Sequence, residues 1–328
     1  MESAPFVSVV TPFCNTREFL AECIESVLRQ TYRNWEYVLV DNCSTDGSSE
    51  IAAHYASRFP GEIRLIRTES FLSQVQNYNF ALSCISPSSK YCKMVQADDW
   101  LFPDCLRSMV DVAEAHPSVG IVSAYELEGD EVHLDGLPYP SHELPGRQVC
   151  RLYFLRGKYL FGTPTSLLLL SELIRRRDPF YDERYAPFED AHACFELLRA
   201  WNFGFVHQVL TYTRRANDSV ISRIRFLGLD LFLHLSILVA HGRDYLDEDE
   251  YVHCLKDAER QYFLYLGKCA CALRRPTAEF WEFHRKGLAS VHYSLDWRLL
   301  WKRIPRALLE KAWDTLWERW DAICDGRR

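Results

Sequence analysis

Residues 7–41, VSVVTPFCNTREFLAECIESVLRQTYRNWEYVLVD, contain two short apolar runs separated by an amphipathic segment. The runs at 7–11 and 37–41 are rich in valine and other strand-forming residues, so both predict buried β-strands. Residues 17–28 repeat apolar side chains with the period of a helix, and these share one face: Phe19, Leu20, Cys23, Ile24, Val27 and Leu28. The stretch therefore predicts two parallel strands connected by a helix.

The same alternation continues through the first 125 residues. Apolar runs predict strands at 63–67, 91–96 and 120–125, and helix-period segments lie at 48–58 and 103–115. Such a succession predicts an α/β fold with a mainly parallel sheet flanked by helices.

The pattern changes after residue 128. A stretch with several Gly and Pro residues at 129–146 indicates a loop or a divergent hairpin. Residues 189–201 then indicate a helix, which we expect Gly204 to stop.

The last third of the chain has a helical pattern from about residue 224. Its most apolar stretch, 226–242, is interrupted by polar residues and falls short of a membrane span, so it predicts a buried helix. We therefore expect a catalytic domain at 1–221 and a helical C-terminal region at 222–328.

Composition excludes several protein classes. With 328 residues, 48% of them hydrophobic, and a net charge of −7, the chain is neither disordered nor drawn to nucleic acid by its overall charge. Its twelve cysteines form no CxxC pair, which argues against a zinc site. The N-terminus shows no export signal, so we expect a cytoplasmic protein with reduced thiols. Neither GxGxxG nor a P-loop is present.

Polar residues follow three of the predicted strands, at the edge of the sheet where parallel α/β folds bind ligands. They are Thr11 with Pro12, Asp41, and Asp98 with Asp99. The two adjacent acids indicate a divalent cation, because ligation converts their repulsion into binding and oxygen ligands suit Mg²⁺ or Mn²⁺. The alternative is a helix N-cap, since a helix is predicted immediately afterwards.

Four motifs of the sequence resemble those of the family 2 glycosyltransferases. They are the block at 7–52, QVQNYNFAL at 74–82, VQADDW at 95–100 and PFEDAHACFELLRAWNFG at 187–204. The resemblance covers residues 6 to about 221 and implies a GT-A fold. Members of this family transfer a sugar from an activated nucleotide donor to an acceptor hydroxyl, with inversion at the anomeric carbon.

The resemblance implies how the first two strands bind the nucleotide. Thr11, Pro12 and Asn15 match a motif whose polar groups contact the base, although Thr11 and Asn15 are also suited to capping a helix. Asp41 matches the acid that accepts a hydrogen bond from the base, a role that suits an acceptor-only carboxylate.

At two of the candidate site positions, 76 and 96, this sequence departs from the family pattern. Gln76 and Asn77 stand where the family usually has Arg-Asn, and a neutral amide attracts a diphosphate less than a guanidinium does. Arg214 and Arg215 resemble a basic segment of relatives and are candidates for supplying the missing charge. In QADD, Gln96 replaces the first Asp of the family's DxD-type motif.

The remaining acids of that motif imply a metal site. By resemblance, Asp98 faces the ribose or the metal, and Asp99 ligates a Mn²⁺ or Mg²⁺ ion that bridges the diphosphate. The ion would neutralise charge on the departing nucleoside diphosphate.

Transfer also needs a base, because an acceptor hydroxyl is a poor nucleophile until its proton is being removed. Asp190 matches the family's catalytic base and Glu189 its frequent companion, with His192 as an alternative. The structural alternative is that both acids favour the first turn of a helix, whose dipole should keep Asp190 ionised.

The C-terminal region carries an apolar stripe at helical spacing: Trp297, Trp301, Ile304, Leu308, Ala312, Leu316, Trp320 and Ile323. Two interpretations stay open. The stripe packs on the catalytic domain, or it forms an interfacial helix that holds the protein at the cytoplasmic face of a membrane.

The acidic residues and the family resemblance together predict an inverting, metal-dependent transferase of hexosyl or N-acetylhexosaminyl type. Its donor is expected to be a UDP-sugar, its acceptor a saccharide or a lipid-linked glycan, and no nucleic acid is expected to bind. The alternative is a non-catalytic protein on the same fold that binds a nucleotide sugar or a glycan. Gln76 and Gln96 favour this alternative, whereas the joint presence of Asp98, Asp99 and Asp190 opposes it.

Overall fold

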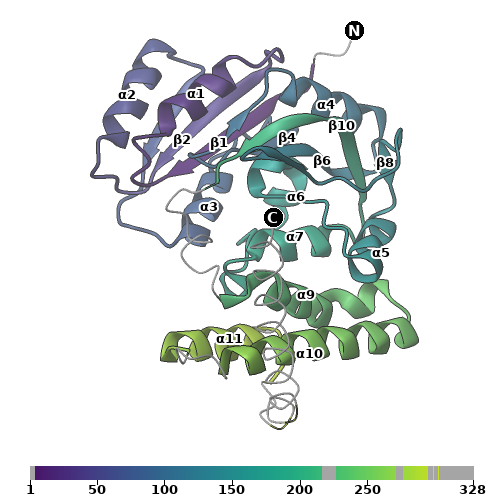
Figure 1. Cartoon of the computed structure of the whole chain (residues 1–328). Helices are drawn as coiled ribbons and strands as arrows, with labels where there is room; N and C mark the ends of the chain where they lie inside the picture. Colours follow the sequence, from purple (N-terminus) through teal and green to yellow (C-terminus); the bar gives the residue numbers. More distant parts are fainter. Residues whose placement is uncertain (1–3, 216–226, 271–275, 295–297, 299–301, 303–328) are drawn as a thin grey trace, which may run out of the picture. The chain divides into compact units, whose positions relative to one another are not determined.

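A computed structural model describes residues 4–215, 227–270, 276–294, 298 and 302 (Figure 1). The chain folds into two compact units, Met1–Asp218 and Ser219–Arg328. The domain boundary that we expected at residue 221 falls outside the described residues and stays a prediction.

The first unit is built on one mixed sheet with the strand order β3-β2-β1-β4-β9-β6-β10-β5. Its first four strands are mutually parallel and have the bounds Val7–Phe13 (β1), Trp35–Asp41 (β2), Ile63–Arg67 (β3) and Tyr91–Met94 (β4). Each begins within two residues of the start expected from its apolar run. The predicted strand–helix–strand unit at 7–41 is therefore present, with α1 (Leu20–Leu28) as its helix.

The other half of the sheet is mixed in direction. β9 (Leu168–Leu170) lies between β4 and β6 (Val119–Glu128) and is antiparallel to both. β10 (Asn202–Thr213) runs parallel to β6, and β5 (Trp100–Leu101) runs antiparallel to β10. The Gly- and Pro-containing stretch supplies β7 (Glu131–His133), which forms a hairpin with β6, and β8 (Glu143–Leu144), which pairs with β10.

Helices flank the sheet (Figure 1). α1, α2 (Ser48–Arg58) and α4 (Cys105–Ala115) contribute to one hydrophobic core, and α3 (Gln74–Ser83) contacts β1 and β2. The remaining helical segments of this unit are α5 (Gly146–Arg156), η1 (Pro164–Ser166), α6 (Ser171–Arg175), η2 (Glu183–Tyr185) and α7 (Glu189–Leu197).

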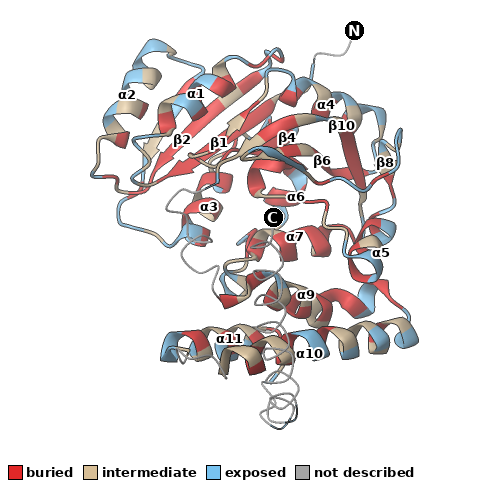
Figure 2. Cartoon of the chain, viewed as in Figure 1, coloured by how far each residue is buried: buried red, intermediate tan, exposed pale blue. Residues whose placement is uncertain are grey.

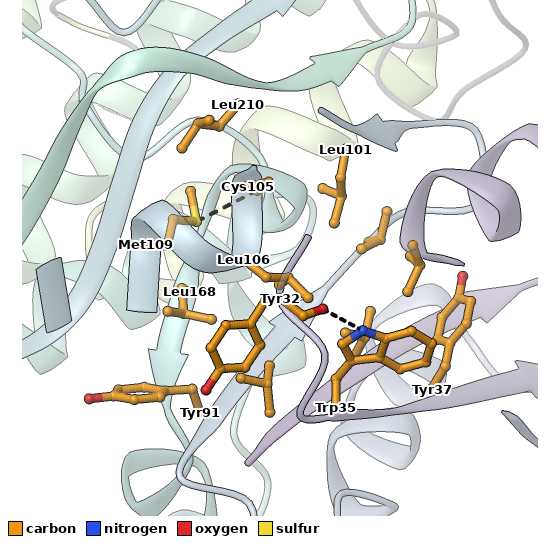
Figure 3. Packing of buried hydrophobic residues seen from close by; sticks show 14 of the residues in the cluster. Tyr32, Trp35, Tyr37, Tyr91, Leu101, Cys105, Leu106, Met109, Leu168 and Leu210 are labelled. Carbon is orange, nitrogen blue, oxygen red and sulfur yellow. Dashed lines mark hydrogen bonds between the residues drawn. The ribbon is translucent and has the colours of Figure 1, made fainter. Parts of the chain in front are cut away.

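Aromatic and aliphatic side chains fill the core between the sheet and the helices α1 and α4 (Figure 3). The Trp35 indole donates a hydrogen bond of 2.9 Å to the Tyr32 carbonyl, so this aromatic ring is buried without an unpaired N–H. Cys105 and Met109 of α4 bring their sulfur atoms to 3.9 Å. Figure 2 shows the central strands almost uniformly buried, as expected for strands covered on both faces.

One predicted helix end is wrong. We expected Gly204 to stop the helix at 189–201, but α7 ends at Leu197 and Gly204 lies within β10. A Cβ atom at Gly204 would lie 3.0 Å from atoms of Val112, Val119 and Val122, so the glycine is needed for close packing and not for a helix end.

The second unit contains the helices α9 (Leu229–Tyr245), α10 (Glu248–Ala270) and α11 (Ala278–Ser290), which confirms the helical C-terminal region. The stretch 226–242 falls mostly within α9, and many of its apolar side chains are buried. In the described part of the chain, no helix has both the length and the apolar character that crossing a membrane requires. The apolar stripe from Trp297 to Ile323 lies outside the described residues, so both of its interpretations, and the membrane-peripheral location, stay predictions.

A lysine is buried in the core of the first unit. Lys93 of β4 is fully buried, and its Nζ donates a hydrogen bond of 3.6 Å to the Met109 sulfur. Burial lowers the pKa of Lys93 below its ordinary value, although the negative charges of Glu126 and Asp99 oppose this decrease. The unfolded chain therefore binds the Lys93 proton more tightly than the folded chain does.

We predict that Lys93→Met raises the free energy of unfolding at pH 7 by about 1 kcal/mol or more, because methionine has a similar length and carries no proton to lose. The gain should shrink as pH rises toward 10.5, the ordinary lysine pKa, where the unfolded chain also loses the proton. Denaturant unfolding at several pH values measures this. The half-exposed Lys90→Met is the control. A Lys93→Met variant less stable than the wild type at pH 7 would contradict the prediction.

Candidate functional site

The predicted base-binding residues lie at the carboxyl ends of β1 and β2, which pair through Phe13 and Asp41. Thr11 is completely buried and its hydroxyl lies 2.9 Å from that of Tyr37, so its side chain is engaged inside the core. Pro12 is also buried and is the register partner of Val40. Neither side chain is presented at the surface of the site in this structure.

Asn15 connects the loops that follow β1 and β2. Its side-chain Oδ1 accepts a hydrogen bond of 2.8 Å from the Thr45 N–H, and its own N–H donates to the Ser44 hydroxyl at 3.1 Å. The residue is exposed and adopts a left-handed backbone, φ 53°, which asparagine tolerates better than most residues. Asn15 therefore holds the two loops together at the edge of the site.

Asp41 ends β2 and is fully buried, and several hydrogen-bond donors surround its carboxylate. The Ser44 N–H donates to Oδ1 at 2.9 Å, the Ser49 hydroxyl donates to Oδ2, and the Arg67 Nε lies 3.6 Å from Oδ2. A carboxylate accepts about four hydrogen bonds, so capacity for a further donor remains. Our sequence analysis missed Arg67, because only the β2–β3 pairing places it beside Asp41.

The QADD segment forms a tight turn after β4, in which the Asp99 N–H donates to the Gln96 carbonyl at 3.0 Å. Asp99 is only 3% exposed. Its Oδ2 accepts from the Thr165 hydroxyl at 2.6 Å, and its Oδ1 accepts from the Arg214 N–H at 3.1 Å. Asp98 is less buried than Asp99. Burial, followed by the neighbouring charge of Asp98, raises the pKa of Asp99 well above its ordinary value.

The structure separates the two predicted arginines. Arg214 lies at the acid turn, where its Nε donates to the Asp98 carbonyl at 3.1 Å and its guanidinium pairs with Glu22 at 2.5 Å. Arg215 instead pairs with Glu128 and Glu131 of the β6–β7 hairpin, at 3.1 Å each. Of these two arginines, Arg214 is therefore the one that brings a positive charge to the acid turn.

Gln76 and Asn77 begin α3 but differ in their surroundings. Gln76 is exposed and completes a capping box, since its Oε1 accepts from the Ser73 N–H at 3.1 Å. Asn77 is buried, and its Oδ1 has no hydrogen-bond partner among the described residues. The structure thus gives Gln76 a local structural role and leaves Asn77 with an unused buried acceptor.

Tyr78, which our sequence analysis did not select, contacts the acid turn from α3. Its hydroxyl accepts hydrogen bonds from the Nε2 atoms of Gln74 and Gln96, at 2.8 and 3.0 Å. Burial raises the pKa of Tyr78, and the charges of Glu189 and Asp98 add to the increase. Tyr78 therefore contacts the acid turn directly, through the Gln96 side chain.

The next residue of α3 fixes the segment that leads into α7. The Asn79 side chain donates to the Tyr181 carbonyl and accepts from the Tyr181 N–H, both at 2.8 Å. The rings of Tyr78 and Tyr181 meet edge to face with their centroids 6.3 Å apart. The segment that precedes η2 and α7 is therefore fixed to α3 at Tyr181.

The second acidic pair opens α7. Glu189 is 4% exposed, and its Oε2 has no hydrogen-bond partner in the described part of the chain. The Asp190 Oδ1 accepts from the Ala191 N–H at 2.8 Å. Burial raises the pKa of Asp190 to about 6, and burial with the charge of Asp190 raises the pKa of Glu189 to about 7. We expected the helix dipole to keep the pKa of Asp190 low, but burial raises it. A carboxyl group with a pKa of about 6 is still mostly ionised at pH 7.

His192 lies one turn into α7 and is buried. Its imidazole stacks on the Tyr185 ring, with 3.8 Å between the ring centroids and 2° between the planes. This stacking holds the ring against η2.

A divalent ion fits the acid turn in chemical terms. Among the described residues no three His, Cys, Asp or Glu side chains converge as a metal cage. A site for Mg²⁺ or Mn²⁺ that also uses substrate phosphates needs only one or two carboxylates. Asp98 and Asp99 supply such a pair, and burial beside a like charge is the condition that a cation relieves.

Comparison with known proteins gives sequence relatives. The profile of glycosyl transferase family 2 matches residues 8–180. The putative glycosyltransferase EpsE of Bacillus subtilis (strain 168) is 36% identical over 147 residues, which are 44% of this chain and 52% of that protein. Glycosyltransferase GlyG of Streptococcus pneumoniae serotype 4 is 26% identical over 223 residues, covering 66% and 72%. The chain thus spans about half the length of EpsE.

Solved structures share the fold. S. aureus TarS 1-349 in complex with UDP-GlcNAc aligns with a TM-score of 0.60 and 15% identity, over 87% of this chain and 79% of that one. The mannosyltransferase PcManGT from Pyrobaculum calidifontis, in complex with GDP-Man and Mn²⁺, aligns with a TM-score of 0.54 and 17% identity, over 97% and 88%. These likenesses confirm the expected GT-A architecture. The family profile covers more than half of the residues of this chain. The chain therefore belongs to glycosyl transferase family 2.

Proposed function

We propose that this protein transfers a sugar from a nucleotide diphosphate donor, in the first instance a UDP-sugar, to a hydroxyl of a saccharide or lipid-linked glycan, with inversion at the anomeric carbon. The observation that carries the proposal is the presence of two separate acidic pairs, Asp98–Asp99 in the turn after β4 and Glu189–Asp190 at the start of α7. Helix α3 contacts the first through Tyr78 and Gln96 and the segment before the second through Tyr181. Inverting transfer needs charge compensation at the leaving diphosphate and a base at the acceptor, and two separate acidic pairs suit these two tasks.

On the donor side, we assign the cation to Asp98 and a supporting role to Asp99. Asp98 is the more accessible of the two acids, whereas Asp99 is almost fully buried and is held in place by hydrogen bonds from Thr165 and Arg214. This assignment reverses the emphasis of our sequence analysis, which made Asp99 the principal ligand. Mn²⁺ or Mg²⁺ bound there would supply Lewis-acid stabilisation of the diphosphate.

Arg214 adds a fixed positive charge to this side of the site. Its guanidinium is held between the Asp98 carbonyl, the Glu22 carboxylate and the Phe19 ring, whose centroid lies 4.6 Å away. A positioned guanidinium stabilises negative charge without reorganising during the reaction. Arg214 is therefore our candidate for the charge that Gln76 lacks, and Arg215 is not.

On the acceptor side, Asp190 is our candidate for the general base, with Glu189 beside it. A partly buried carboxylate with a pKa of about 6 is mostly ionised at pH 7 and is a stronger base than an exposed aspartate. Asp190 would take the acceptor proton as the hydroxyl bonds to the anomeric carbon, while the leaving diphosphate keeps the electron pair of the broken bond.

The structural neighbours support a nucleotide-sugar donor. TarS was solved with UDP and with UDP-GlcNAc, and PcManGT with GDP-Man and Mn²⁺. For the present chain, a UDP-hexose or UDP-N-acetylhexosamine is the first donor to test.

The competing function is a non-catalytic binder of nucleotide sugars or glycans on the same fold. One observation favours it: Gln76 and Gln96 are both engaged within the chain, with Ser73 and Tyr78, and neither brings a charge. Hydrolysis of nucleotide sugars with and without Mn²⁺ separates the two functions, because a binder retains the donor intact.

We predict that Asp98→Asn weakens Mn²⁺-dependent binding of UDP by about tenfold or more, because an amide oxygen replaces a charged ligand. Isothermal titration calorimetry with and without Mn²⁺ measures the effect. Asp104→Asn removes an exposed acid of the same segment and should bind UDP normally. Mn²⁺-dependent affinity that survives Asp98→Asn and disappears in Asp99→Asn would return the ligand role to Asp99.

Removal of the base should damage turnover more than binding. We predict that Asp190→Asn lowers kcat by about 10²-fold or more while the affinity for UDP changes little, as expected for a positioned general base. Glu189→Gln and His192→Ala are measured alongside. If Asp190→Asn turns over normally and one of these neighbours is inactive, the base is that neighbour.

The raised pKa values predict an acid limit to activity. Because Asp190 and Glu189 take up protons as pH falls through about 7 to about 6, kcat/KM for transfer should decline over this interval and not near pH 4. A pH profile of transfer tests this, with UDP binding over the same range as the control. Full activity at pH 5 would exclude this pair as the base.

A further inference from the structure

The QADD turn depends on a hydroxyl from a distant part of the chain. Thr165 lies in η1 and is fully buried. Its Oγ1 accepts a hydrogen bond of 3.0 Å from the Gln96 N–H and donates one of 2.6 Å to the Asp99 Oδ2. A single side chain therefore contacts the first and the last residue of the turn.

Sheet topology explains how Thr165 reaches this position. β9 is antiparallel to β4, with Lys93 opposite Leu168 and Tyr91 opposite Leu170. When this register is continued beyond the ladder, residue 165 falls opposite residue 96. The pairing of β9 with β4 thus delivers η1 to the end of β4.

The hydrogen-bonding capacity of the hydroxyl matches its two partners. A threonine hydroxyl has one hydrogen to donate, which Asp99 receives, and lone pairs that accept from the Gln96 N–H. Both partners are drawn from the loop that ends β4, where an unpaired backbone N–H or carboxylate would be costly to bury. Removal of the hydroxyl therefore leaves two polar groups of the turn without this partner.

The same short segment contains a second threonine hydroxyl, which differs from that of Thr165 in its hydrogen bonding. Thr163 lies two residues before Thr165, and its Oγ1 is buried without a hydrogen-bond partner in the part of the chain that the structure describes. Replacement of Thr163 by valine keeps the side-chain shape and removes no hydrogen bond. The chain thus offers a matched control for Thr165.

We propose that Thr165 is a positioning residue, which sets the conformation of the QADD turn and thereby the direction in which Asp98 faces the donor diphosphate. The proposal rests on the proposed function for its effect on the donor, but its structural part stands on the two hydrogen bonds. Thr165 itself contacts the turn and not the reacting atoms.

The test uses the full-length chain and two measurements. In Thr165→Val, hydrogen exchange at residues 95–100 should accelerate, because the Gln96 N–H loses its acceptor. UDP affinity in the presence of Mn²⁺ should fall by about tenfold to a hundredfold, the effect expected from one hydrogen bond to a charged group. Thr163→Val should leave both quantities unchanged, and Thr165→Ser should restore both.

A comparison of two further variants tests the hydroxyl even if Thr165→Val misfolds. Thr165→Ser and Thr165→Ala lose the same methyl group and differ only in the hydroxyl, so a difference between them isolates its effect. If exchange at 95–100 and UDP affinity are the same in all Thr165 and Thr163 variants, the proposal is overturned. If UDP does not bind even to the wild type, the donor assignment fails, and the exchange measurement alone decides whether Thr165 holds the turn.

Discussion

Two neighbouring aspartates at the end of β4 impose the main electrostatic constraint on the catalytic unit. Asp98 and Asp99 carry like charges, and Asp99 is almost fully buried, which is costly unless donors surround it. The donors come from two distant segments, the Thr165 hydroxyl and the Arg214 N–H. The acid turn is therefore held by hydrogen bonds with two other parts of the chain, η1 and the segment after β10.

Helix α3 contacts both this acid turn and the segment that precedes the second acidic pair. Tyr78 receives hydrogen bonds from Gln96 on one side, and its ring contacts Tyr181 on the other. Asn79 fixes the backbone of Tyr181 through two hydrogen bonds. Neutral glutamine at position 96 is consistent with this arrangement, because its amide N–H can donate to the Tyr78 hydroxyl, whereas an ionised aspartate has no donor.

The acidic pair at the start of α7 shows burial and helix position acting in opposite directions. A helix N-terminus favours ionised carboxylates, but burial raises the pKa values of Glu189 and Asp190 together. The result is a carboxylate that is ionised near neutral pH and still basic enough to take a proton. The sequence alone predicted that Glu189 and Asp190 lie in the first turn of a helix. How deeply these two side chains are buried is decided by the packing around α7.

By itself, the sequence determined the strand–helix–strand unit at 7–41, the parallel order of the first strands, and the acids that follow β2 and β4, since periodicity and strand-end polarity are local properties. It did not reveal β9, a run of leucines too short to distinguish from a helical segment, nor the end of α7 at Leu197. The tertiary structure alone decided that Arg214 and not Arg215 lies at the acid turn, that Gln76 caps α3, and that Thr165, Tyr78 and Arg67 contact site residues. These contacts join residues far apart in the chain through strand pairing and packing, and no local pattern encodes which distant side chain fills a given place.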